Sequence, residues 1–276
     1  MIKNEGVCAM QWFEALSHPI QALWATCFTW AVTAAGAGMV FLFRRKNMLF
    51  LDAMLGFAAG VMIAASFWSL LSPAITLAEQ LKMNAWAVAA VGFVGGGLLL
   101  FSADKIYDRL QAQMIKKGNK TGGLKRCILL VFSITLHNSP AGLAVGVAFG
   151  SLQYGLEGAT LPAACLLALG IGLQNFPEGT AVSLPLHREG LTAPKAFFWG
   201  QLSGMVEPLA GLVGAYLAIH VRSALPFLLA FAAGAMIYVV VEELIPESQA
   251  GSKPQIMALF TLFGFTVMMV LDTALS

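Results

Sequence analysis

Apolar residues occur along this chain in long runs that short polar stretches separate. A run of about 18 or more apolar residues is long enough to cross the hydrocarbon core of a bilayer as a helix. The sequence predicts eight such spans, at about 22–43, 50–71, 85–103, 127–150, 161–186, 195–219, 224–245 and 256–274. Helices are expected because the strands of membrane barrels are short and alternate apolar with polar residues. We therefore predict an all-α membrane protein, with an N-terminal segment at 1–21 and one transmembrane domain at 22–276.

Charged residues are scarce and unevenly distributed. Of the 276 residues, 58% are hydrophobic and 11% are charged, against roughly 25% charged residues in ordinary soluble domains. Loops rich in Lys and Arg stay in the cytoplasm, and an even number of spans places both termini on one side. With both termini outside, thirteen of the 16 Lys and Arg residues fall in cytoplasmic loops. The three that fall outside are Lys3, Lys82 and Arg222.

This charge distribution predicts a multi-pass protein of the cell membrane, plasma or inner, with both termini extracytoplasmic. The basic stretch between the third and fourth spans predicts a cytoplasmic loop at 104–126. Retention of positive charge on that side explains the stretch without a nucleic-acid partner. Membrane lipid is the expected surroundings of the spans.

Two similar polar motifs interrupt the fourth and fifth spans. They read TLHNSPAGLAVGVAFG at 135–150 and GLQNFPEGTAVSLPL at 172–186. A polar side chain inside a span costs several kcal/mol unless it faces a partner, a cavity or an ion. The polar residues in question within the two motifs are His137, Asn138, Gln174, Asn175 and Glu178.

Each motif also contains a proline. Pro140 and Pro177 lack the N–H that would bond four residues back, which frees the carbonyls of Leu136 and Leu173. Unpaired carbonyls at membrane depth are tolerated mainly where they line a cavity. The pattern predicts two broken helices with polar clusters near mid-membrane, which is typical of an ion or substrate site.

A third acidic position lies in the sixth span. Glu207 stands in GQLSGMVEPLAGLVG and is followed by Pro208, which predicts another helix distortion. A cation shared with Glu178 would keep both carboxylates charged. Imidazole and carboxylate ligands suit Zn²⁺ and its first-row neighbours, whereas Ca²⁺ and Mg²⁺ prefer oxygen ligands alone. Met62 in the second span offers a thioether, with core packing or lipid contact as the alternative reading.

Several glycines recur four residues apart. The sets are Gly56 and Gly60; Gly142, Gly146 and Gly150; and Gly200 and Gly204. This spacing lets helix backbones approach closely. It predicts packing seams without chemistry of their own.

These residues resemble the ZIP family of metal-ion transporters, whose fourth and fifth spans carry a His-Asn-x-Pro-Glu-Gly type motif. LQNFPEG, with Gln in the His position, and SGMVEPLAG are similar to the GufA-like branch, and YVVVEELIPE at 238–247 extends the likeness. The resemblance implies a ZIP-type bundle of eight helices, in which helices one, four, five and six move against two, three, seven and eight. It also suggests a homodimer.

The resemblance further implies roles for individual residues. His137, Gln174, Glu178 and Met62 match the primary metal site, and Asn138, Asn175, Glu178 and Glu207 match an adjoining secondary site. Glu243, and with a weaker match Glu242 and Asp104, correspond to the cytoplasmic exit route; solvated acids at the membrane interface are the alternative.

One position departs from the family pattern. Ala141 stands in HNSPAG where the family has the glutamate that bridges the two metal positions. The sequence leaves open natural divergence, altered metal selectivity, impaired transport or an engineered substitution. We expect one well-occupied metal position, and expect Ala141→Glu to raise the number of bound ions toward two.

The functional expectation is transport of divalent transition-metal ions into the cytoplasm. Zn²⁺ is favoured as the transported ion, with Cd²⁺, Fe²⁺, Mn²⁺ and Co²⁺ as alternatives, and no catalytic cofactor is expected. A carrier for a small organic solute is the alternative function, although the acidic residues would repel anionic solutes. An intramembrane enzyme is not expected, because Ser203 lies in GQLSG rather than G-x-S-G and no H-E-x-x-H motif is present.

Overall fold

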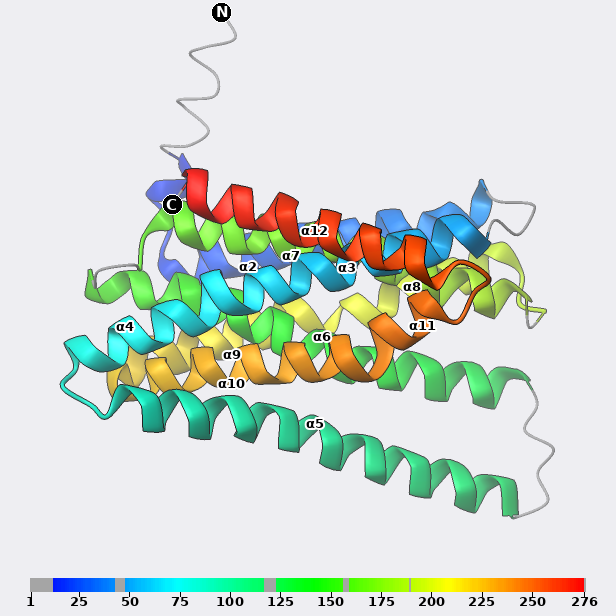
Figure 1. Ribbon diagram of the computed structural model, residues 1–276, viewed down its shortest axis with the longest axis horizontal. Coiled ribbons are helices and arrows are strands. Elements are labelled where there is room, and N and C mark those ends of the chain that lie inside the picture. The colour runs from blue at the N-terminus through cyan, green and yellow to red at the C-terminus, as the bar shows by residue number, and fades with distance from the viewer. Residues whose placement is uncertain (1–11, 43–47, 117–122, 156–158, 189, 276) are drawn as a thin grey trace, which may run out of the picture.

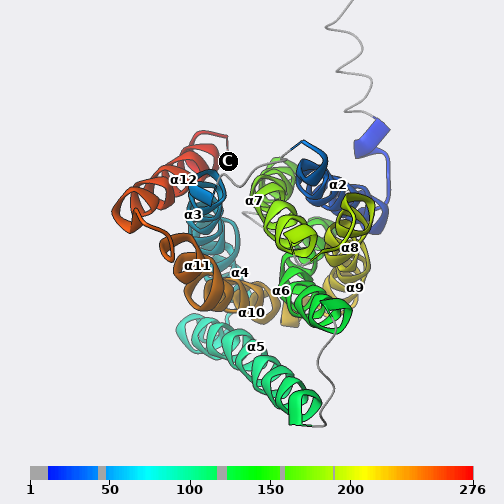
Figure 2. The same cartoon turned by 90° about the vertical axis from the view of Figure 1, so that its right-hand side faces the viewer.

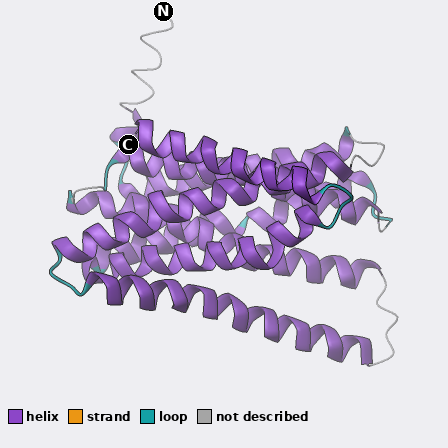
Figure 3. Cartoon of the chain, viewed as in Figure 1, coloured by secondary structure: helices purple, strands orange, loops and turns teal. Residues whose placement is uncertain are grey.

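The computed structural model describes residues 12–42, 48–116, 123–155, 159–188 and 190–275. These residues form helices joined by short turns, and the described ranges contain no strand (Figure 3). The helices are α2 (His18–Ala37), α3 (Met48–Ala65), α4 (Ser72–Gln80), α5 (Ala85–Lys116), α6 (Gly123–Ser151), α7 (Leu161–Arg188), α8 (Ala193–Gly204), α9 (Val206–His220), α10 (Leu225–Val239), α11 (Ile245–Gln249) and α12 (Pro254–Leu275). The expectation of an all-α fold is confirmed for this part of the chain.

Six helical segments of the described residues are long and apolar enough to cross a membrane. They are His18–Phe41, Leu49–Gln80, Ala85–Ile106, Ala193–His220, Arg222–Gln249 and Pro254–Ala274. Each overlaps one of the predicted spans. The fourth and fifth predicted spans fall in α6 and α7, which have 29 and 28 residues. At 1.5 Å per residue either helix reaches about 40 Å, more than the roughly 30 Å hydrocarbon core. The chain is a multi-pass helical membrane protein.

Two boundaries differ from the sequence prediction. The helix α2 begins at His18, with Pro19 in its first turn, so it starts four residues before the predicted first span. Pro is favoured there because it removes only an N–H that has no partner inside the helix. The predicted loop at 104–126 is also shorter, since α5 continues to Lys116 and α6 begins at Gly123. Polar residues extend both helices beyond their apolar runs.

The helices pack as two groups that lie side by side (Figure 2). The first group contains α2, α6, α7, α8 and α9, and the second contains α3, α4, α5, α10, α11 and α12. This division agrees with the one that the family resemblance implied. The groups meet mainly where α7 packs on α3 and α6 packs on α10. In Figure 1, the start of α2 and the end of α12 lie at the same end of the bundle.

Glycine seams hold each group together. A Cβ atom on Gly146 of α6 would overlap the carbonyl oxygen of Gly211 of α9, and one on Gly60 of α3 would overlap that of Thr261 of α12. Gly204 of α8 similarly faces Thr33, where a Cβ would lie 2.9 Å from the threonine side chain. The predicted close approach at these glycines is confirmed. The contacts at Gly146 and Gly60 join backbone to backbone, and each of the three contacts lies within one group.

The three prolines of the polar spans differ in whether the helix breaks near them. The prediction that Pro140 and Pro177 break their helices is wrong, because α6 and α7 continue through both residues. Neighbouring helices can stabilise a proline inside a membrane helix. Pro208 does accompany a break, since α8 ends at Gly204 and α9 starts at Val206.

Two further prolines follow π-helical turns. Pro73 follows the turn Ser66–Leu71, and Pro246 follows the turn Val240–Leu244. A proline ring clashes with the carbonyl four residues earlier, and a wider turn relieves that clash. The second turn carries Glu242 and Glu243. Pro246 therefore helps to set the direction of these acids.

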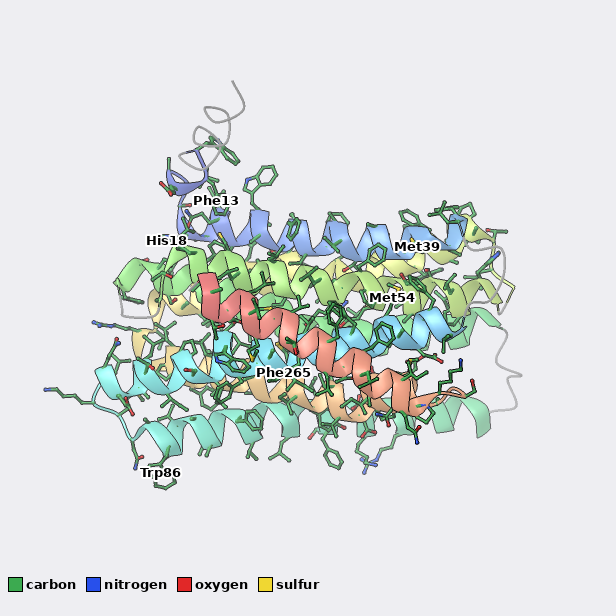
Figure 4. The ribbon with its side chains drawn as sticks, turned by 45° about the horizontal axis from the view of Figure 1, so that its top comes forward. Phe13, His18, Met39, Met54, Trp86 and Phe265 are labelled. Atoms are coloured by element: carbon green, nitrogen blue, oxygen red, sulfur yellow. The ribbon has the colours of Figure 1, made fainter. Side chains whose placement is uncertain are left out.

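Large apolar side chains cover the outer faces of the bundle. Trp86 at the start of α5 is 74% exposed and points away from the bundle (Figure 4). Other exposed apolar side chains continue along α5 and α12, among them Val91, Val94, Leu98, Leu259, Leu262 and Phe263. Exposed apolar area on this scale suits a hydrocarbon surrounding rather than water.

Candidate functional site

A small cavity lies between the two helix groups. Its volume is about 40 Å³, which is larger than the roughly 10–15 Å³ that one water molecule needs. Residues from both groups line it: Leu55 and Met62 of α3, Asn138 and Ala141 of α6, Gln174, Glu178 and Ala181 of α7, and Val239, Glu243, Leu244 and Glu247 of the α10–α11 segment. Five of the predicted metal-site residues, Met62, Asn138, Gln174, Glu178 and Glu243, therefore meet at one place, together with Ala141.

The first group contributes amide and carboxylate oxygens to this cavity. Asn138 and Gln174 are buried, and Glu178 stands one helical turn from Gln174 on the same face of α7. The Nδ2 of Asn138 donates to the carbonyl oxygen of Ser203 at 3.1 Å, which leaves the amide oxygen as its acceptor end. The Oε1 of Gln174 is buried without a hydrogen-bond partner among the described residues. A buried acceptor without a partner is rare and suits a site that binds a donor or a cation.

The second group contributes a thioether and two carboxylates. Met62 is 2% exposed and lines the cavity, so the alternative of lipid contact is wrong for this residue. Glu243 belongs to the π-helical turn Val240–Leu244, and Glu247 follows in α11. Both lie on the same cavity wall, four residues apart. The lining of the cavity thus extends from Met62 of α3 to Glu247 of α11, the short helix that precedes α12 (Figure 1).

Glu207 does not line this cavity. Its side chain is fully buried, and it accepts hydrogen bonds from the Nδ2 of Asn175 at 2.7 Å and 2.9 Å. The hydroxyl of Thr29 donates to the same carboxylate. Neither Glu207 nor Asn175 is among the residues that line the cavity with Glu178. The two acids thus face different surroundings, and a cation shared between them stays a prediction.

His137 lies in α6, one residue before Asn138, and its side chain is outside the described residues. Within the described ranges, no group of three or more His, Cys, Asp or Glu side chains is placed to hold a metal ion. The cavity instead offers one thioether, two amides and carboxylates. Such a mixed set suits a borderline metal that is bound and released, since soft and hard donors are both present.

A second, larger cavity lies farther along the boundary between the groups. It has a volume of about 250 Å³ and contains Trp68, Ala148, Leu167 and Asp272 in its lining. On α6, Ala148 stands two helical turns from Ala141, which is about 10 Å at 1.5 Å per residue. The hydroxyl of Ser69 donates to Asp272 at 2.7 Å at this cavity. It is nearer to the end of the bundle where α12 ends.

Two residues of this region were missed in the sequence. Glu247 lies one turn beyond Glu243, and that spacing could have placed both acids on one face. Thr29 belongs to a row of buried threonines on α2, Thr26, Thr29 and Thr33. A row of polar residues inside an apolar span indicates that this side of the helix packs against another helix.

Comparisons with known proteins show the family to which the chain belongs. The family model described as ZIP Zinc transporter matches residues 111–272. The chain is 38% identical to Zinc transporter ZIP11 of Homo sapiens, over 94% of this chain and 98% of that protein. It is 38% identical to Zinc transporter ZIPB of Bordetella bronchiseptica, over 89% of this chain and 78% of that protein. It is 39% identical to Zinc transporter GufA of Myxococcus xanthus, over 75% and 80%. With both the helix groups and the motifs in place, the chain belongs to the ZIP family.

Proposed function

We propose that this protein transports divalent transition-metal ions across the membrane, with Zn²⁺ as the favoured ion. The observation that carries the proposal is the cavity in which Met62, Gln174 and Glu178 meet between the two helix groups. The names of the relatives, all zinc transporters, support the same ion. We assign transport and no catalytic reaction, and treat Cd²⁺, Fe²⁺, Mn²⁺ and Co²⁺ as competing substrates.

The size of the cavity favours an ion over an organic solute. Pockets for small organic molecules usually enclose about 300–1,000 Å³, whereas this cavity encloses about 40 Å³. A dehydrated metal ion and a few ligand atoms fit such a space. The acidic lining also suits a cation, because Glu178 and Glu243 both face it.

We propose a ligand set drawn from three helices, α3, α6 and α7. Glu178 supplies the negative charge, and Gln174 and Asn138 supply amide oxygens. Met62 supplies a thioether, which favours a borderline or soft ion over Mg²⁺ or Ca²⁺. His137 completes the set in this proposal, since it stands one turn before Ala141 on α6. Glu243 receives the ion on the cytoplasmic side.

We propose eight spans, with α6 and α7 crossing the membrane beside the six segments named above. Lys82 and Arg222 lie in turns at one end of the bundle, whereas Arg188, Lys195 and Lys253 lie in or near the turns at the other. Positive charge is retained in the cytoplasm, so the end of the bundle where α2 starts and α12 ends faces outward.

Cysteine labelling tests this orientation. In a variant lacking the four native cysteines, Lys82→Cys should react with an impermeant maleimide in intact cells, because that turn lies outside. Lys253→Cys should react only after the membrane is permeabilised. Both positions are exposed, so access to the reagent is matched. The reverse pattern of labelling would contradict the topology.

Transport in this proposal requires the two groups to move against each other. The seams within each group bring backbones together at glycines, while the contact between α7 and α12 places the side chain of Met268 against Gly170. Side-chain contacts can be exchanged more easily than interlocked backbones, so the boundary between the groups is the expected plane of motion. The cavity of about 250 Å³ is the proposed outer approach, and Glu243 and Glu247 mark the inner one.

Flux measurements in liposomes test the function. The purified chain, reconstituted around a Zn²⁺-sensitive dye, should admit Zn²⁺ and Cd²⁺ faster than protein-free liposomes do. The same liposomes should take up no radiolabelled glucose or glutamate, because the cavity is too small for them. Uptake of the organic solutes without metal flux would reject the proposal in favour of an organic solute carrier.

A further inference from the structure

The carboxylate of Glu207 is enclosed by hydrogen-bond donors from two other helices. The Nδ2 of Asn175 on α7 lies 2.7 Å from one carboxylate oxygen and 2.9 Å from the other. The hydroxyl of Thr29 on α2 donates to one of the same oxygens. All three residues are fully buried. Both oxygens of this acid therefore already have partners that belong to the protein.

Four helices of the first group meet at Glu207. Glu207 is the second residue of α9, and a Cβ on Gly142 of α6 would lie 2.6 Å from the Glu207 carbonyl oxygen. The α6 backbone thus closes one side of Glu207, and Thr29 and Asn175 close the other. A buried polar group is stabilised only when its partners are supplied, which makes this contact a fixed point of the group.

The amide nitrogen of Asn175 stands where a cation bound to both carboxylate oxygens would stand. We infer that Thr29 and Asn175 close the second metal position by donating to Glu207, so that the transporter carries one ion at a time in the cavity beside Glu178. The inference rests on the proposed function, because it concerns the number of metal ions in the same region. Thr29 and Asn175 are positioning residues in this scheme, and Glu207 is held away from the transported ion.

The donor end of the Asn175 amide supports this arrangement. Its Oδ1 is buried without a hydrogen-bond partner among the described residues. For that oxygen to bind a cation on Glu207, the amide would have to turn over. It would then lose the two contacts of Nδ2 with Glu207 and the contact with the carbonyl oxygen of Thr29 at 3.2 Å. The donor end of the amide therefore stabilises the closed position.

Asn175→Asp tests the inference, because it keeps the shape of the side chain and replaces the donor by an acceptor. Two carboxylates would then face each other without a donor between them, an arrangement that a divalent cation stabilises. Zinc bound per chain would be counted by plasma mass spectrometry and calorimetry on the purified full chain. We expect about one tightly bound ion in the unchanged protein and about two in Asn175→Asp. The double variant with Glu207→Gln should return to about one.

Other results would overturn the inference. Two tight ions in the unchanged protein, falling to one in Glu207→Gln, would show that Glu207 already binds metal. A folded Asn175→Asp protein that still binds one ion would also contradict it. If that variant does not fold, Glu207→Gln alone decides, since closure predicts an unchanged count of one. Bound zinc without flux into liposomes would reject the proposed function alone, whereas no bound zinc at all would reject both.

Discussion

Glu178→Ala is expected to lower Zn²⁺ uptake at least about a hundredfold. Glu178 lines the cavity together with Met62 and Gln174, and in the proposed ligand set it carries the formal negative charge beside the ion. Removing one partner of a buried charge pair costs roughly 3–5 kcal/mol. Since about 1.4 kcal/mol corresponds to a factor of ten, this loss corresponds to a hundredfold or more.

Uptake of radioactive zinc into reconstituted liposomes measures the effect. Glu178→Gln should fail almost as completely, because it keeps the size of the side chain and removes the charge. Glu79→Ala is the matched control, since Glu79 is an exposed acid near the end of α4, and Zn²⁺ uptake by this variant should be unchanged.

His137→Ala should weaken uptake and shift the preference away from Zn²⁺ toward ions that need no imidazole. Near-normal uptake by a folded Glu178→Ala protein would refute the proposed site.

Ala141→Glu is expected to change the number of bound ions and the pH dependence of binding. Ala141 is 3% exposed and lines the same cavity as Glu178, so a carboxylate at this position would face that acid. Two carboxylates without a cation repel each other, and one of them then holds a proton. Metal binding must displace this proton, so affinity should fall more steeply as the pH is lowered from about 7 to about 5 than in the unchanged protein.

Calorimetry in buffers of different ionisation enthalpy measures the released protons, and metal counting measures the stoichiometry. We expect the count to rise above one in Ala141→Glu, because the added carboxylate and Glu178 line the same cavity and can bind a second ion there without Glu207. Ala181→Glu is a useful comparison, because Ala181 lines the cavity on α7 one turn beyond Glu178. A carboxylate there does not restore the family pattern. If the unchanged protein already binds two ions tightly between α6, α7 and α9, the interpretation of Ala141 is wrong.

The cavity could not be assigned from the spacing of residues alone. Helical periodicity places Gln174 and Glu178 on one face of α7, and this part of the prediction needs no tertiary structure. Nothing in the local pattern shows which helix that face meets. The spans are apolar on nearly every side, so the sequence does not show which side of a span packs against other helices. Residue spacing does not bring Glu178 together with Met62 and Glu243, whereas the packing of α7 on α3 and of α6 on α10 does.

The course of the helices at the prolines was also decided by tertiary structure. The sequence predicted breaks at Pro140, Pro177 and Pro208 from the missing N–H groups. Only the last of these accompanies a break, between Gly204 and Val206. A missing backbone hydrogen bond costs free energy locally. Whether the helix then breaks depends on how closely the neighbouring helices pack against it. Gly142 beside Glu207 and Gly179 beside Thr33 supply such close neighbours to α6 and α7.

The sequence by itself determined the helical class, six of the spans, the polar motifs and the family. These features depend on the transfer of each side chain from water to lipid, which is a property of the residue and its neighbours in the chain. Only the tertiary structure decided that Glu178 faces a cavity while Glu207 faces Thr29 and Asn175. The physical reason is that the rotation of an apolar helix about its axis is set by backbone packing at glycines such as Gly146 and Gly60, which the hydrophobic pattern does not encode.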